Sequence, residues 1–243
     1  MESSSIADVI IVGAGPGGVS AAVQCKRLGL KPILLDETGQ AGGLAICANR
    51  IENYPGLLPM NGREFAELLR EHIRRFGILI QPAKVKAVDY LDNGFSIETD
   101  IGVFCSKTVV SAVGTAPKIL DLPGAEYLKY SPLELPEDNC LTAAVIGGGE
   151  ASLDYAMSLS SKGIPVTVLV RSKRLKASGL LVESAIKNNK INIVFGAVPS
   201  KIERNFDKLT VQFCCSSIKS IKVDNVIAAI GRVSRIKEVL KEL

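Results

Sequence analysis

The 243-residue sequence has no tryptophan, a single histidine, only 5% aromatic residues, and no apolar run of the about 18 residues that cross a membrane. The lone histidine, His72, lies in the charged stretch 70–75, so no histidine-based catalytic pair is expected. The N-terminus lacks the basic region of a signal peptide. A net charge of +4 is too small and dispersed to favour nucleic acid. We therefore expect a cytoplasmic protein with neither membrane nor nucleic-acid partners.

The cysteines show no CxxC or zinc-type spacing and are typical of reduced thiols in a cytoplasmic protein. Their spacing predicts no metal site. They are Cys25, Cys47, Cys105, Cys140, Cys214 and Cys215.

A β-branched run at residues 8–12 is followed by Gly13-x-Gly15-x-x-Gly18, a helical pattern over 16–28 and a strand over 32–35. The first glycine permits a tight turn, the second lets backbone approach a pyrophosphate, and the third allows close helix packing. Asp36 and Glu37 follow the second strand, where an acid holds ribose hydroxyls. This order predicts an adenine dinucleotide site; the alternative is a glycine-rich turn without a ligand.

The same plan recurs in the second half of the chain. Residues 143–149 again give strand and glycine turn, followed by a helix over 150–162 and a strand over 165–170. We predict an α/β fold of two tandem Rossmann-like dinucleotide-binding domains, three-layered, each a parallel sheet with a small antiparallel β-meander. The expected boundaries are 1–117 for the first domain, 118–139 for a linker, 140–231 for the second domain and 232–243 for a C-terminal tail.

Other local patterns are clear between the repeats. Asn61 and Glu64 have capping-box spacing, which predicts a helix start. Asp92-Asn93-Gly94 is a hairpin turn signal. The predicted buried stripe of the helix comprises Phe65, Leu68, Leu69, Ile73 and Phe76.

The two copies differ where nucleotide specificity is set. In the first copy, acidic residues follow the second strand; they suit a free ribose diol and repel a 2′-phosphate. The second has Arg171, Lys173, Arg174 and Lys176 there, as expected for a 2′-phosphate; the alternative is a solvated loop. We expect a dinucleotide without the extra phosphate in the first copy and NADP(H) in the second.

Several motifs resemble those of the low-molecular-weight thioredoxin reductases and their relatives. They are Gly42-Gly43, Glu52-Asn53-Tyr54-Pro55-Gly56, Ala112-x-Gly114-Thr115-x-Pro117, Val145–Gly149 and Val166–Arg171. The resemblance covers nearly the whole chain and implies FAD in the first domain and NADPH in the second, with NADH as the alternative, and an enzyme that passes hydride from one to the other.

By position, the resemblance to this family implies a set of residues that contact each nucleotide. For FAD these are Gly13, Gly15, Gly18, Asp36 or Glu37, Gly42, Asn53, Val85 through its backbone, and Gly114. For NADPH they are Gly147, Gly149, Glu150, Arg171, Lys176 and Gly231. Ser152 stands where a small third residue is usual, and Ser172 replaces one of the family's paired arginines.

Two departures affect the expected activity. The family's CxxC precedes the second glycine turn, where residues 127–142 contain Cys140 alone. The family's return segment with its flavin-binding Gly-Asp is also not found, so we expect weaker FAD binding or a site completed by another chain or a homodimer partner. Cys47 is a candidate redox thiol; the alternative is a small apolar filler.

Three functional hypotheses follow. The first is a flavin oxidoreductase that delivers electrons to a non-dithiol acceptor, either a small molecule or a redox protein. The second is a nucleotide-binding sensor, or a subunit of a larger complex, with reduced catalysis. The third is a disulfide reductase that works through Cys47 or a partner's thiols.

Overall fold

The computed structural model describes residues 6–136 and 140–240, which form two compact units. Unit 1 contains residues 6–46, 50–116 and 234–240, and unit 2 contains residues 47–49, 117–136 and 140–233. No helix in these described residues is long and apolar enough to cross a membrane. The predicted α/β class is confirmed.

Unit 1 is built on a six-stranded sheet of order β3-β2-β1-β6-β5-β4. Strands β1 (Ala7–Val12), β2 (Pro32–Asp36), β3 (Ile80–Pro82) and β6 (Val103–Ser111) are parallel. Strands β5 (Gly94–Thr99) and β4 (Val85–Leu91) extend the sheet antiparallel, joined by the predicted turn at residues 92–94. The sheet is thus the parallel core with a meander that the sequence predicts.

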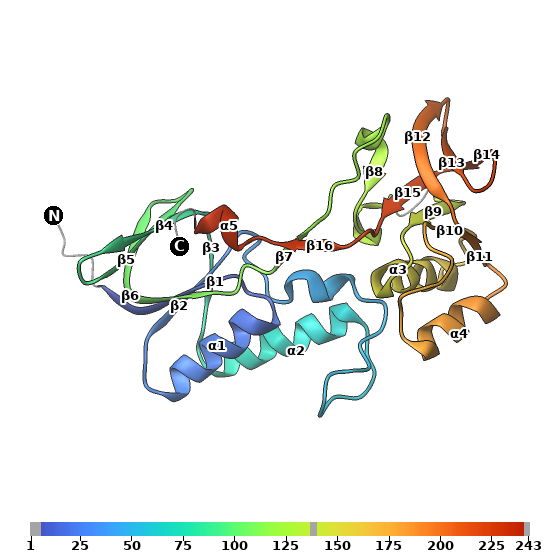
Figure 1. Ribbon diagram of the computed structural model, residues 1–243. Coiled ribbons are helices and arrows are strands. Elements are labelled where there is room, and N and C mark those ends of the chain that lie inside the picture. Colours follow the sequence, from blue (N-terminus) through green and yellow to red (C-terminus); the bar gives the residue numbers. More distant parts are fainter. Residues whose placement is uncertain (1–5, 137–139, 241–243) are drawn as a thin grey trace. The chain divides into compact units, whose positions relative to one another are not determined.

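Alternation along β1 divides the core of unit 1 into two faces. Val9 and Ile11 pack with α1 (Pro16–Arg27) and α2 (Gly62–Arg75), which lie on one side of the sheet (Figure 1). Ile10 and Val12 belong to the cluster on the opposite face, where α5 (Ile236–Val239) contacts β4. This opposite face is the one that forms a cavity.

The capping box of α2 is present: Glu64 N–H donates to Asn61 Oδ1 (2.9 Å) and Asn61 N–H donates to Glu64 Oε2 (3.0 Å). Phe65, Leu69 and Ile73 are buried as predicted. The prediction that Leu68 belongs to the buried stripe is wrong, because Leu68 is 45% exposed.

Unit 2 repeats the plan with a five-stranded parallel sheet of order β11-β10-β9-β15-β8. Helices α3 (Glu150–Ser161) and α4 (Gly179–Lys187) pack on one face, and an antiparallel three-stranded sheet packs on the other. The parallel strands are β8 (Leu128–Lys129), β9 (Ala143–Ile146), β10 (Val166–Val170), β11 (Ile191–Phe195) and β15 (Asn225–Ala228). The antiparallel strands are β12 (Val198–Asn205), β13 (Lys208–Cys214) and β14 (Ile218–Val223).

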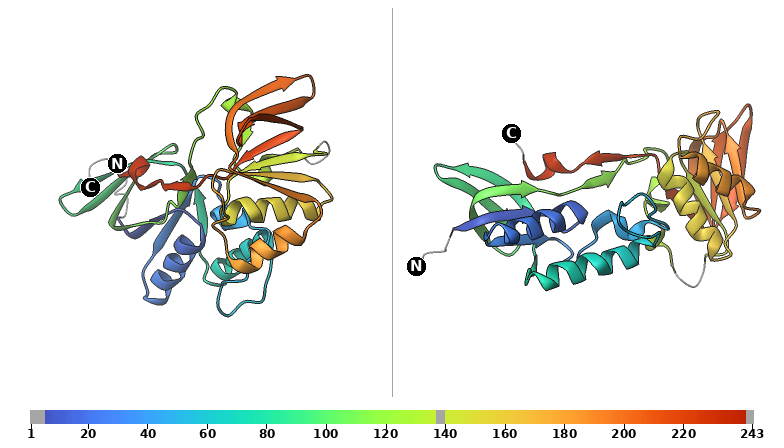
Figure 2. Two further views of the ribbon diagram at one scale, coloured as in Figure 1. Left: turned by 45° about the vertical axis from the view of Figure 1, so that its right-hand side comes forward. Right: turned by 90° about the horizontal axis from the view of Figure 1, so that it is seen from below.

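The segments expected as linker and tail contain regular structure. Residues 118–136 include the 3-10 helices Ala125–Tyr127 and Pro132–Glu134 and supply edge strand β8, which pairs with β15. In the expected tail, β16 (Arg232–Ser234) pairs with β7 (Thr115–Pro117), and α5 follows (Figure 2). A two-residue strand and a one-turn helix are too short to show periodicity in the sequence.

Asp224 forms hydrogen bonds that connect two segments of unit 2. Its Oδ2 accepts hydrogen bonds from Thr142 N–H (2.7 Å) and Thr142 Oγ1 (2.8 Å), and Lys208 Nζ lies 2.5 Å from Oδ1. Burial raises the pKa of Asp224, but the hydrogen bonds from Lys208 and Thr142 outweigh it, so the pKa lies below its usual value. The carboxylate therefore ties the start of β9 to the turn between β14 and β15.

We expect Asp224→Asn to lower the free energy of unfolding by about 1–3 kcal/mol at neutral pH, because it removes a charged hydrogen-bond acceptor. A depressed carboxyl pKa stabilises the fold above the unfolded value of about 3.9, and this stabilisation is lost as pH falls through the folded pKa. Urea unfolding followed by circular dichroism should therefore show the difference from wild type shrinking below about pH 4. Glu126→Gln, an exposed charge in the same unit, is the matched control; an equal loss there would contradict the prediction.

Candidate nucleotide sites

The glycine turn of unit 1 follows β1. Gly13 has φ +102°, and a Cβ on it would lie 2.3 Å from the Ala112 carbonyl oxygen. A Cβ on Gly18 would lie 1.7 Å from the Gly13 carbonyl oxygen. Gly15 differs, because nothing lies within 4 Å of the position its Cβ would take. Gly13 and Gly18 are thus required by packing, whereas Gly15 leaves open space at the N-terminus of α1.

Asp36 is bonded to the same turn. Its Oδ2 accepts Ala14 N–H (2.8 Å), and its Oδ1 accepts Thr38 N–H (2.8 Å) and Thr38 Oγ1 (2.6 Å). Asp36 therefore ties the glycine turn to the end of β2, and it also lines a cavity.

The neighbouring carboxylate, Glu37, has a partner far away in sequence. Arg235 Nη1 lies 2.7 Å from Glu37 Oε1, and Arg235 Nε donates to Glu238 Oε2 (2.9 Å). Both carboxylates raise the pKa of the Arg235 guanidinium, which stays protonated. The backbone N–H of Arg235 donates to the Gly114 carbonyl (3.2 Å). These bonds fix the start of α5 on unit 1.

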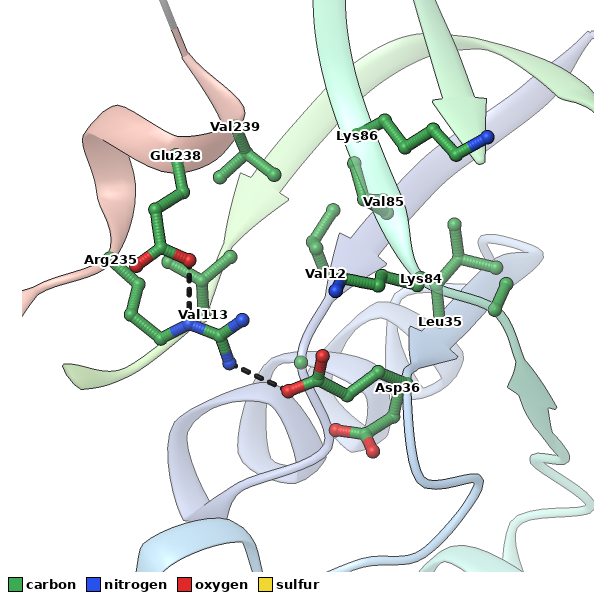
Figure 3. A pocket seen from close by; sticks show the side chains of 13 residues that line it. Val12, Leu35, Asp36, Lys84, Val85, Lys86, Val113, Arg235, Glu238 and Val239 are labelled. Atoms are coloured by element: carbon green, nitrogen blue, oxygen red, sulfur yellow. Dashed lines mark hydrogen bonds and ion pairs between the residues drawn. The ribbon is translucent and has the colours of Figure 1, made fainter. Parts of the chain in front are cut away.

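A cavity of about 320 Å³ lies between the ends of β1 and β2, β4 and α5. Small-molecule sites are commonly about 300–1,000 Å³. Figure 3 shows Lys84 reaching across the cavity toward Val12 and Lys86 pointing away. Three carboxylates and three cations line it, together with aliphatic side chains. The lining comprises Val12, Gly13, Leu35, Asp36, Glu37, Ala83, Lys84, Val85, Lys86, Val113, Arg235, Glu238 and Val239.

The structure brings only some of the expected FAD residues to this cavity. Gly13, Asp36, Glu37 and Val85 line it. Elsewhere in unit 1, Gly42 N–H donates to the Ala14 carbonyl (2.9 Å), next to the glycine turn, and Asn53 is exposed in the loop before α2.

Sequence reasoning missed the cations of the cavity and α5. Lys84 and Lys86 flank the predicted Val85, which is a weak signal in the sequence. No local pattern identifies Arg235, since its partner Glu37 lies 198 positions away.

The glycine turn of unit 2 is similar but not identical. A Cβ on Gly147 (φ +145°) would lie 2.2 Å from the Ala229 carbonyl oxygen, and one on Gly148 would lie 2.6 Å from Val170 Cγ1. Gly149, like Gly15, has nothing within 4 Å of its Cβ position. Buried Ser152 occupies the third position and donates its Oγ hydrogen to the Gly149 carbonyl (2.8 Å). The open glycine again precedes a helix N-terminus, that of α3.

The segment after β10 closes around this turn. Lys176 N–H donates to the Gly148 carbonyl (2.6 Å), and Glu150 Oε1 accepts Ser178 N–H (2.5 Å). The side chains of Arg171, Lys173, Arg174 and Lys176 are exposed. The backbone thus brings Lys176 next to the glycine turn. Gly231, also in unit 2, accepts Lys118 N–H (2.9 Å) after β15.

All six cysteines are free thiols. Cys47 is half-buried against the α3 side of the unit 2 core, and its sulfur accepts the Ser131 hydroxyl (3.4 Å). Burial raises the pKa of the Cys140 thiol, which disfavours the reactive thiolate. Residues 6–136 and 140–240 contain no group of three or more His, Cys, Asp and Glu side chains placed to hold a metal ion.

Comparison with known proteins identifies the family of the chain. The sequence profile of the pyridine nucleotide-disulphide oxidoreductases matches residues 7–243. The chain belongs to this family. It is 33% identical over 193 residues to a thioredoxin reductase of Treponema pallidum, a match that covers 76% of this chain and 62% of that protein.

Two further similarities extend along nearly the whole chain. A glucosaminate ammonia-lyase of Pseudomonas fluorescens is 29% identical over 247 residues, 92% of this chain and 73% of that protein. The crystal structure of T. acidophilum thioredoxin reductase superposes with a TM-score of 0.87 at 28% identity, covering 96% of this chain and 79% of that one. The chain spans 62–65% of the length of the curated thioredoxin reductases that head its matches.

The contrast between Gly13 and Gly15 gives a paired prediction. We expect Gly13→Ala to lower the free energy of unfolding by about 2 kcal/mol or more, because it combines positive φ with a backbone clash. Gly15→Ala should cost less than about 1 kcal/mol, since its φ of −67° suits alanine and its Cβ enters open space. Denaturant unfolding measures both, and equal losses would contradict the assignment.

Proposed function

We propose that this chain is a flavin-dependent NAD(P)H oxidoreductase of the thioredoxin-reductase-like type, which passes hydride from NAD(P)H to FAD and on to a non-dithiol acceptor. One observation carries the proposal. Each unit has an open glycine at a helix N-terminus, with carboxylates beside it in unit 1 and cations beside it in unit 2. A free ribose diol suits the first arrangement and a 2′-phosphate the second.

The residues of unit 1 fit FAD. Gly15 leaves room for a pyrophosphate at the N-terminus of α1, where free N–H groups favour anions. The cavity beside Asp36 has aliphatic walls for an adenine ring. We propose that FAD is held by Gly13, Gly15, Gly18, Asp36, Glu37, Gly42, Asn53, Val85 and Gly114.

The residues of unit 2 fit NADPH in the same way. Gly149 is open at the N-terminus of α3, and Arg171 follows β10 with an exposed guanidinium suited to a phosphate. We propose that NAD(P)H is held by Gly147, Gly149, Glu150, Arg171, Lys176 and Gly231. When both nucleotides are bound, the flavin supplies the acceptor for the nicotinamide's hydride.

The cysteine positions support an acceptor other than an internal dithiol. Cys140 is alone in the stretch before the second glycine turn, and its raised pKa disfavours a thiolate. The acceptor is then a small molecule or a redox protein, reached by the chain alone, as a homodimer or with a completing partner chain. Similarity alone does not choose among acceptors, because thioredoxin reductases and an ammonia-lyase both match. Cys47 as a redox thiol is the alternative to direct transfer.

The test is an absorption spectrum of the protein loaded with FAD and then titrated anaerobically with NADPH. We expect a bound flavin band that bleaches, and we expect Cys47→Ser to bleach equally and to retain turnover with both a quinone and a disulfide as acceptor. A protein that binds nucleotide but shows no bleaching would favour the sensor or subunit hypothesis. Loss of turnover in Cys47→Ser with flavin still bound would favour the thiol mechanism.

The cations of unit 2 give a second prediction. We expect Arg171→Ala to raise the KM for NADPH about tenfold or more, because a charged hydrogen bond to phosphate contributes about 1.5–3 kcal/mol. The KM for NADH should change by less than about twofold, because NADH lacks the 2′-phosphate that the guanidinium is proposed to bind. Steady-state kinetics with both nucleotides measures this, with Lys187→Ala at the exposed end of α4 as control. Equal effects on NADPH and NADH would refute the assignment of Arg171.

A further inference from the structure

The acceptor positions of Asp36 are nearly all used within the protein. A carboxylate offers about four lone-pair positions. Three are occupied in Asp36: Oδ2 accepts Ala14 N–H, and Oδ1 accepts both Thr38 N–H and Thr38 Oγ1. Asp36 therefore has one acceptor position left for a ligand. A ribose diol has two hydroxyl donors, so a second acceptor is needed.

Glu37 is the neighbouring carboxylate in the same cavity. It follows Asp36 directly, lines the cavity with it, and has one oxygen, Oε1, bonded to Arg235. A glutamate side chain that is 40% exposed loses rotamer freedom when it binds a ligand. A partner that already restricts Glu37 lowers this cost, which is the advantage of preorganisation.

Arg235 provides that restriction because it is itself fixed. Its Nε donates to Glu238, its Nη1 donates to Glu37, and its backbone N–H donates to Gly114. Its side chain is only 30% exposed, and Figure 3 shows it between Glu238 and the carboxylates after β2. The guanidinium also offsets part of the charge of Glu37, which reduces the repulsion between Glu37 and Asp36.

The geometry points to a division of labour at the ribose of the nucleotide in unit 1, with Asp36 accepting one hydroxyl, Glu37 accepting the other, and Arg235 acting as the positioning residue that holds Glu37. This inference rests on the proposed function only in that unit 1 binds an adenosine nucleotide. It assigns a role to α5 and to a residue that no motif in the sequence identifies.

The test compares ligands that differ by one hydroxyl. ADP, 2′-deoxy-ADP and 3′-deoxy-ADP are titrated by calorimetry into the full 243-residue chain freed of nucleotide. The NADPH site is blocked with excess NADP⁺. In the wild type, each missing hydroxyl should weaken binding about five- to tenfold, which corresponds to about 1–1.4 kcal/mol.

Two variants test the assignment of Glu37 and of Arg235. Glu37→Gln keeps an oxygen for Arg235 but loses the second acceptor, and Arg235→Gln releases Glu37. In both, we expect the preference for ADP over one of the two deoxy nucleotides to fall below twofold, while the preference over the other stays. Lys237→Gln, an exposed charge in the same helix, should keep both preferences. If Arg235 only stabilised the fold, Arg235→Gln would weaken the binding of all three ligands equally.

The outcomes distinguish a failure of the role of Arg235 from a failure of the proposed function. Both preferences retained in Arg235→Gln, or all three ligands weakened equally, would overturn the role of Arg235 and leave the proposed function intact. A wild-type chain that binds neither FAD nor ADP would overturn both. If Arg235→Gln fails to fold, Glu37→Gln decides, because retained preferences in that variant would overturn the assignment of the second hydroxyl.

Discussion

The architecture of unit 1 depends on the close approach of α1 to the end of β1. A Cβ on Gly18 would lie 1.7 Å from the Gly13 carbonyl oxygen, so only glycine allows the helix to start where it does. This approach aims the helix N-terminus at the carboxyl end of the parallel strands, where ligands of open α/β sheets bind. Asp36 reinforces it through Ala14 N–H. Unit 2 reaches a similar arrangement with Ser152, whose hydroxyl hydrogen bond stays within the first turn of α3.

The charged side chains beside the two glycine turns differ in how far they are bonded within the protein. In unit 1 the carboxylates are engaged by backbone N–H groups, by a threonine and by Arg235, so they are fixed in place. In unit 2 the cations after β10 are exposed, and only the backbone of Lys176 is bonded to the glycine turn.

Much of this was predictable from the sequence, because it follows from local patterns. The glycine turns, the α2 capping box, the hairpin turn at 92–94 and the repeat of the strand–turn–helix plan all involve residues close together in the chain. The role of residues 232–240 was not predictable in this way. The contact of Arg235 with Glu37 spans 198 positions, and α5 has only one turn, so neither leaves a periodic signal. The prediction that Leu68 is buried was wrong because periodicity shows which face of a helix is apolar but not how far the neighbouring elements cover that face.

The central claim is that the chain carries two separate nucleotide sites, one on each copy of the fold. Calorimetric titration of the chain with FAD, followed by NADP⁺ added to the FAD-saturated protein, tests it most directly. We expect one equivalent of each nucleotide per chain, with the NADP⁺ affinity unchanged by FAD. Displacement of FAD by NADP⁺, or binding of only one nucleotide per chain, would contradict it.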